Sequence, residues 1–187
     1  MDSPLKKFVE DVSDLGPAPD AIALSSLVGG FTLDLDYWSH HIDRIGEQSS
    51  WMHASDRGIQ VAVARRTDGT MSYVHSHNVS VALSAIVGVE THRHYHVQQG
   101  DDDHVTATLL EERHLRGGTG EVVTLVPPHD VHSHGHVRGT GDWPYTLIVL
   151  GDNQFRFERK EFDLSVGRSR VLPPGDRGTP NLPAPVG

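Results

Sequence analysis

The spacing of apolar residues along this chain changes once, near residue 59. Before that point apolar residues recur at helical spacing, and Ser3–Pro4 and Asp20 supply helix start signals. Gly16–Pro17 and Gly29–Gly30 supply stop signals. The first fifty residues are therefore expected to be helical, with helices over residues 4–15, 20–30 and 34–45.

From residue 59 onward, apolar and polar residues alternate with a period of two, which is typical of β-strands. Turn-forming sequences such as TDG, QGDDD and RGGTG separate the alternating segments. Many short strands at regular spacing predict a sandwich or a barrel. The segments expected to be strands are residues 59–65, 79–89, 90–97, 104–114, 121–126, 145–150 and 154–162.

The length of 187 residues suits a single domain with a sizeable hydrophobic core. We expect an N-terminal helical segment over residues 1–56 and a β-barrel over residues 57–163. Residues 164–187 end in a stretch rich in proline and glycine, which predicts an extended C-terminal tail.

Composition excludes several classes of function. The net charge of −9 and the lack of a long basic run argue against a nucleic-acid partner. No apolar stretch is long enough to span a bilayer, and no signal peptide is recognised, so we expect a cytoplasmic protein without a membrane partner. The absence of cysteine rules out disulfides, thiolate ligands and a cysteine nucleophile. A monomer or a small homo-oligomer is expected.

The 14 histidines are the main chemical feature of the sequence. His75 and His77 are two residues apart, so on a strand they share one face and direct two imidazoles at one point. The sequence PPHDVH places His132 just after a proline-rich turn, 55 residues beyond His77. Neutral imidazoles suit iron, nickel, copper and zinc. The alternative is a site built from His92 and His94 with His134 or His136, and the roles of His92, His94, His96, His129 and His136 stay open.

The segment from about residue 59 to 151 resembles the cupins, and within them the cysteine dioxygenase-like thiol dioxygenases. The resemblance rests on His75-x-His77, Gly88, Glu90-Thr91, PPHDVH and the late strand TLIVLG. It implies an all-β cupin double-stranded β-helix (a jelly-roll barrel) with N-terminal helices. It also implies one metal bound by His75, His77 and His132, with iron(II) expected and nickel(II) or cobalt(II) compatible with the same ligands.

General cupins carry a glutamate shortly after the H-x-H pair, where this chain has Val81 and Ala82. The resemblance therefore implies three neutral ligands and a mononuclear non-haem dioxygenase that oxidises the sulfur of a small thiol with O₂. L-cysteine or a close relative is the expected substrate. The sequence assigns no catalytic residue beyond the metal site.

Three alternatives to this activity stay open. The family's late-strand His and Tyr are replaced here by Ile148 and Leu150, which suits a biosynthetic relative that remodels cysteine beyond sulfinate, for example to a sulfonamide. The second alternative is a non-catalytic cupin that binds a metal or a small ligand. The third is a non-oxidative cupin enzyme, such as an isomerase.

An amino-acid substrate needs a cation for its carboxylate. Trp51 and His53 stand where the family often has an arginine, and Arg66 aligns with an inward position of its strand. Arg66 is expected either inside the barrel or in solvent at the strand mouth. His134 is expected to share the inward face of His132. The expected substrate-binding residues are Arg66, His134, Trp51, His53 and Tyr73.

Overall fold

The computed structural model describes residues 3–16, 19–45, 50–54, 58–66, 69, 71–100 and 104–176. Three helices come first, as the apolar spacing predicts: α1 (Ser3–Ser13), α2 (Ala21–Thr32) and α3 (Leu35–Ile45). Asp20 caps α2, because its carboxylate accepts hydrogen bonds from the backbone N–H groups of Ile22 and Ala23, both at 3.0 Å. Within the described ranges, no helix is long and apolar enough to cross a membrane.

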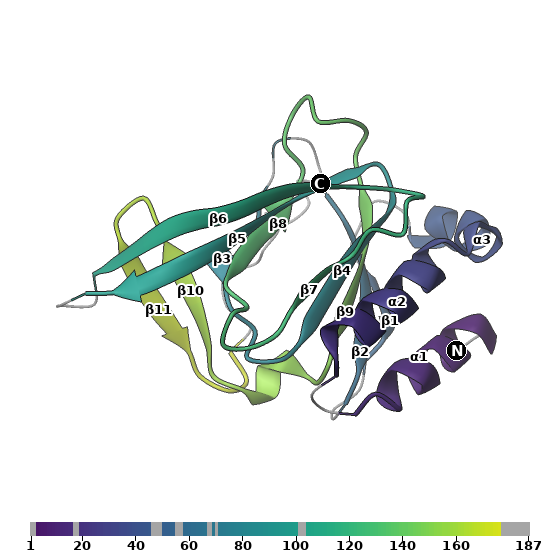
Figure 1. Ribbon diagram of the computed structural model, residues 1–187, viewed down its shortest axis with the longest axis horizontal. Helices are drawn as coiled ribbons and strands as arrows, with labels where there is room; N and C mark the ends of the chain where they lie inside the picture. The colour runs from purple at the N-terminus through teal and green to yellow at the C-terminus, as the bar shows by residue number, and fades with distance from the viewer. Residues whose placement is uncertain are drawn as a thin grey trace.

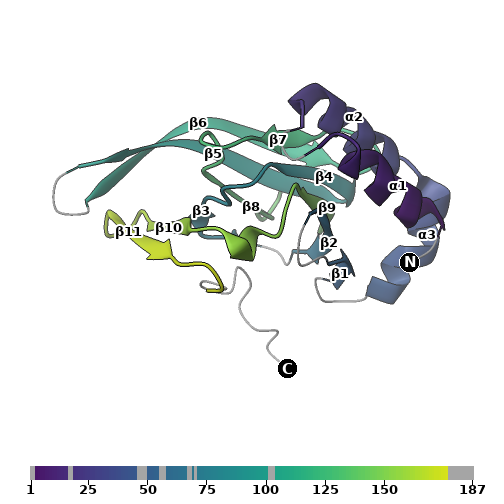
Figure 2. The ribbon, with the colours of Figure 1, turned by 90° about the horizontal axis from the view of Figure 1, so that it is seen from below.

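Two antiparallel sheets follow the helices and face each other (Figures 1 and 2). The first sheet has the order β1 (Ser50–His53), β2 (Gln60–Arg65), β9 (Tyr145–Leu150), β4 (Val81–Val87) and β7 (Val123–Leu125). The second has the order β11 (Arg168–Leu172), β10 (Arg159–Asp163), β3 (Val74–His75), β8 (His132–Gly135), β5 (Val89–Gln99) and β6 (Val105–Arg116). The expected fold class, an all-β cupin barrel with N-terminal helices, is confirmed.

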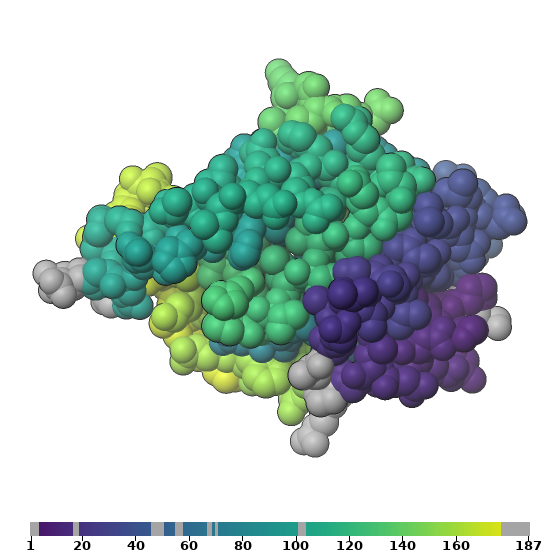
Figure 3. All heavy atoms as spheres, in the orientation of Figure 1, coloured from purple at the N-terminus to yellow at the C-terminus, as the bar shows by residue number. Residues whose placement is uncertain are grey.

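The two faces of the first sheet have different neighbours. Val61 and Val63 face outward and join Phe8, Phe31 and Trp38 of the helices in one buried cluster. Figure 3 shows α1 and α2 packed against this side of the barrel, opposite the β5–β6 hairpin. The alternate residues of β2 therefore face the barrel interior. The helices cover one face of the sheet and leave the other free to build a site.

Two expectations near the C-terminus need correction. Residues 154–162 do not form one strand: Gln154–Arg156 form the short 3₁₀ helix η2, because the Asn153 side chain accepts the N–H of Phe155, and β10 begins only at Arg159. Part of the expected tail is also paired in a sheet. Arg168–Leu172 form β11 on the edge of β10, where Arg170 donates to Glu161 at 2.8 Å. Residues 177–187 lie outside the described residues, and the domain boundaries stay a prediction.

Gly88 forms the corner at which the chain leaves β4 for β5 and passes from the first sheet to the second. Its φ of 72° is in the left-handed region, which favours glycine. A Cβ at this position would lie 2.3 Å from the backbone oxygen of Trp143. Gly88 thus allows close backbone packing at the start of β5, the strand that carries Glu90 and His92 into the barrel.

We predict that Gly88→Ala destabilises the protein far more than Gly118→Ala does. Gly118 has a φ of 74°, but nothing lies within 4 Å of a Cβ there. Gly118→Ala should therefore cost only the left-handed backbone penalty of about 1–2 kcal/mol. Gly88→Ala must also displace the Trp143 backbone, so the free energy of unfolding should fall by an amount on the order of 4 kcal/mol. Urea denaturation measures both values, and equal losses would show that the corner is not tightly packed.

Candidate metal centre

The structure brings together the three histidines that the sequence selects. His75 lies on β3 and His132 on β8, and the two residues are direct partners in the antiparallel pairing of these strands. His77 follows two residues after His75. One ring nitrogen from each residue lies within 4.8 Å of the other two, and all three side chains are buried. Among the described residues this group contains no carboxylate, as the replacement of the cupin glutamate implies.

Hydrogen bonds at Nδ1 orient all three rings. The Nδ1 atom of His75 lies 2.7 Å from the Tyr73 backbone oxygen, and that of His132 lies 2.8 Å from the Asp130 backbone oxygen. The Nδ1 atom of His77 contacts the Gln154 side-chain oxygen. These oxygens only accept hydrogen bonds, so each Nδ1 carries the proton and each Nε2 carries a lone pair. This is the tautomer that binds metal through Nε2.

Among the described residues, the Nε2 atoms have no hydrogen-bond partners that suit this tautomer. Those of His75 and His77 lie 3.0 Å apart, yet two lone pairs cannot form a hydrogen bond with each other. The Nε2 atom of His132 is buried and has no hydrogen-bond partner among the described residues. Unpaired buried polar atoms are costly. A cation bound by the three nitrogens removes this cost, so the group fits a metal ion. The identity of the metal is not determined by these residues.

Burial keeps these imidazoles neutral. Loss of water contact, together with the nearby charge of Arg66, lowers the pKa of His75 to about 4, against the opposing hydrogen bond to the Tyr73 backbone. Burial and the neighbouring His75 lower the pKa values of His77 and His132 well below the usual range. At neutral pH the three rings are therefore available as ligands without first losing a proton.

Asp130 supports the group from outside it. Its carboxylate is buried and accepts hydrogen bonds from the backbone N–H groups of His77 and Asn78, both at 2.8 Å. Asp130 therefore joins the turn after His77 to the turn before β8. Sequence reasoning missed this role, and that of Gln154, although PPHDVH contains Asp130. The position of Asp130, two residues before His132, was the available signal.

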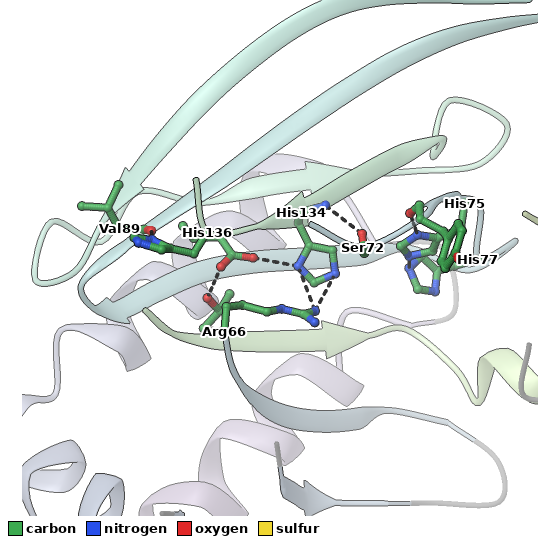
Figure 4. Close-up of polar contacts among 10 residues, drawn as sticks. Arg66, Ser72, His75, His77, Val89, His134 and His136 are labelled. Atoms are coloured by element: carbon green, nitrogen blue, oxygen red, sulfur yellow. Dashed lines mark hydrogen bonds and ion pairs between the residues drawn. The ribbon is translucent and has the colours of Figure 1, made fainter. Parts of the chain in front are cut away.

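A second buried polar cluster, which contains Arg66 and His134, lies beside His75 and His77 (Figure 4). The Nδ1 atom of His134 lies 2.7 Å from Oε1 of Glu90. The other carboxylate oxygen of Glu90, Oε2, accepts a hydrogen bond from the Thr146 hydroxyl at 2.9 Å. The Arg66 guanidinium lies 3.1 Å from Nε2 of His134. Arg66 is therefore inside the barrel, not in solvent at the strand mouth. Burial raises the pKa of Glu90 to about 7, although Arg66 opposes that rise. The centroids of the His134 and His132 rings are 5.5 Å apart.

The other expected substrate-binding residues lie further out. Trp51 and His53 are on β1, the edge strand of the first sheet, and the Trp51 side chain is exposed. The Tyr73 side chain is also exposed, and only its backbone oxygen reaches His75. Contacts among the described residues place none of these three side chains against the histidine group. Substrate binding by these residues, and by Arg66 and His134, stays a prediction.

The histidines of open role fall in different places. His92 is buried, and its ring stacks on that of His132 with centroids 5.2 Å apart. His94 and His129 line a cavity together with His92. His136 is buried and contacts the Val89 oxygen, whereas His96 is exposed. The alternative metal site at His92 and His94 is not assembled: within the described ranges, His75, His77 and His132 are the group whose ligand atoms converge.

No protein-family model and no curated protein matches this sequence. Solved structures resemble it only distantly. A cupin-like protein from Thermotoga maritima is 19% identical, with a TM-score of 0.39, over 67% of this chain and 75% of that chain. The DMSP lyase DddQ from Ruegeria pomeroyi is 14% identical, with a TM-score of 0.40, over 59% of this chain and 49% of that chain. This chain thus spans less than half the length of that lyase. These likenesses carry no activity over to this chain, and its cupin fold rests on its own sheet topology.

We predict that His132→Ala leaves the protein folded but removes a bound metal. The variant deletes one of three converging nitrogens and leaves the pairing of β3 with β8 to the backbone. Metal content after loading with iron(II) under nitrogen, measured by mass spectrometry, should fall from about one equivalent to near zero. The control is His114→Ala, since His114 is exposed on β6. Full metal retention in His132→Ala would place the site elsewhere.

The metal-free protein should lose stability as the pH falls from about 7.5 to about 5.5. A buried histidine whose pKa in the folded protein lies below 6.5 stays neutral there, whereas the same residue in the unfolded chain binds a proton below about pH 6.5. Its contribution to the free energy of unfolding is therefore fully present above pH 6.5 and is lost as the pH falls toward its pKa in the folded protein. Five behave in this way: His75, His77, His92, His132 and His134. Glu90 has the opposite sign, because its raised pKa favours folding at low pH.

The combined effect of the five histidines exceeds that of Glu90. The net loss in the free energy of unfolding over this pH range should therefore be on the order of 5 kcal/mol. Urea denaturation at the two pH values measures it. A stability that is flat, or that rises toward low pH, would mean that the rings are not buried in the neutral form.

Proposed function

We propose that this chain is a metal-dependent enzyme that oxidises the sulfur of a small thiol with O₂, and that its substrate is cysteine or a relative of cysteine. The observation that carries the proposal is the set of three buried neutral imidazoles, His75, His77 and His132, with no carboxylate among them. Neutral ligands leave the charge of a divalent ion uncompensated, which favours an anionic ligand such as a thiolate. A bound metal would lower the pKa of a coordinating thiol and hold its sulfur in place for oxidation. Iron(II) is the proposed metal, and nickel(II) and cobalt(II) suit the same ligands.

The protein supplies orientation and a proton acceptor. The contacts at Nδ1 keep the three Nε2 atoms directed at one point. The Glu90 carboxylate, whose pKa of about 7 lets it take up a proton near neutral pH, is hydrogen-bonded to His134 beside the metal group. In the proposal, this pair accepts the proton that the thiol releases on binding. The overall reaction adds both atoms of O₂ to the sulfur, R–SH + O₂ → R–SO₂H, so it needs no external reductant.

The test is aerobic incubation of the iron(II)-loaded protein with L-cysteine, in an oxygen electrode and with mass spectrometry of the products. The expected result is uptake of one O₂ per thiol and a product heavier by two oxygen atoms, with neither in His132→Ala. O₂ uptake with a different product mass would favour the remodelling of cysteine beyond sulfinate. Metal binding without O₂ uptake on any thiol would contradict the proposal and favour a non-catalytic cupin.

A further inference from the structure

The barrel has a seam between β6 and β7. These strands are the last in their respective sheets, and they lie on the same side of the barrel (Figures 1 and 2). A cavity of about 330 Å³ lies at this seam. His92 and His94 of β5 and Glu111 and Arg113 of β6 line one side of it, and β7 lines the other.

The seam cavity adjoins the candidate metal centre through His92. The His92 ring lines the cavity and also stacks on the ring of His132. His92 is only 2% exposed, yet its Nε2 atom has no hydrogen-bond partner among the described residues. His94, which also lines the cavity, is the direct strand partner of His132. A buried polar atom without a partner, at the point where the cavity meets the histidine group, indicates a place for a polar ligand.

Two side chains of opposite charge, Arg113 and Glu111, line the outer part of the seam cavity. Arg113 pairs with His92 across β5 and β6, and Glu111 pairs with His94, so the side chains of both charged residues share the inward face. Among the described residues, the Arg113 guanidinium makes long contacts, at 3.4 Å to the Val122 oxygen and 4.0 Å to Glu121. Glu111 forms no ion pair with any residue that the structure describes. A guanidinium and a carboxylate two residues apart match the carboxylate and the ammonium group of an α-amino acid.

The distance between these charges and the metal group bears on the length of the ligand. In the second sheet β5 separates β6 from β8, so Glu111 and His132 are two strand spacings apart. Two spacings amount to about 10 Å. Cysteine has one methylene between its sulfur and its α-carbon and is too short to span this distance. A thiol joined to an α-amino-acid head group through an extended linker, as in a γ-glutamyl peptide, has the required length.

We propose that the seam cavity binds the α-amino-acid head group of an elongated thiol, with the carboxylate on Arg113 and the ammonium group on Glu111, while the sulfur reaches the histidine group past His92. This assignment rests on the proposed function for the fate of the sulfur, but the head-group site itself does not depend on turnover. It differs from a site in which Arg66, deep in the barrel beside Glu90 and His134, binds the substrate carboxylate.

The test uses a peptide that cannot react at sulfur. The probe is γ-glutamyl-2-aminobutyrate, which has the head group and linker but no thiol, with binding to the metal-loaded protein measured by NMR titration. Glu111→Gln and Arg113→Ala should each raise the dissociation constant about tenfold or more. The matched controls are Glu112→Gln and Arg116→Ala on the outward face of the same strand, which should change it less than about twofold. Because Arg113 contacts the segment just before β7 through the Val122 oxygen, Arg113→Lys is included, and its effect should lie between those of the wild type and Arg113→Ala.

Four outcomes would overturn the assignment. The first is failure of the wild type to bind the probe, and the second is equal effects of inward and outward variants. The third is loss of binding in Arg66→Ala with full binding in Arg113→Ala, which would move the head group into the barrel. The fourth is a second equivalent of iron(II) that is abolished by His94→Ala, which would make the seam cavity a metal site. Oxidation of L-cysteine is measured separately, so failure of the head-group site and failure of the proposed function are distinguishable.

Discussion

The site depends on three hydrogen bonds that fix which nitrogen of each imidazole carries a proton. Tyr73, Asp130 and Gln154 each present an oxygen to an Nδ1 atom, and this leaves three buried Nε2 lone pairs directed at one point. In the metal-free protein that arrangement is unfavourable, since buried lone pairs face one another without donors. A bound cation turns the same arrangement into a favourable one. The rings, their supporting oxygens and the pairing of β3 with β8 therefore act as one unit.

The barrel tolerates this polar interior because the hydrophobic core lies largely elsewhere. The helices bury the outer face of the first sheet with Phe8, Phe31 and Trp38, and a smaller apolar cluster fills the inner side around Leu83 and Leu115. The remaining interior is left to polar groups that pair with one another, as Glu90 does with His134 and Thr146. The larger apolar cluster thus lies outside the barrel, between the sheet and the helices, whereas the candidate metal centre lies inside it.

Local patterns predicted what depends on local geometry. The period of two identified most strands, and the H-x-H spacing and PPHDVH selected His75, His77 and His132. Strand parity left Arg66 open between the barrel interior and solvent, and the structure buries it. Contacts between segments far apart in the chain were not predictable in this way. The partnership of Gln154 with His77, the stacking of His92 on His132 and the addition of β11 to the sheet all depend on how strands pair. No periodicity within one segment encodes such pairings.

The ring tautomers of His75, His77 and His132 test the metal centre most directly. They are measured by ¹⁵N NMR of histidine side chains in the metal-free protein and during titration with zinc(II), a diamagnetic probe. We predict that all three rings are neutral and protonated at Nδ1 at neutral pH, and that their three Nε2 resonances alone shift together as one equivalent of metal binds. Protonation at Nε2 in any of the three rings, or binding of metal without a shift of these resonances, would contradict it.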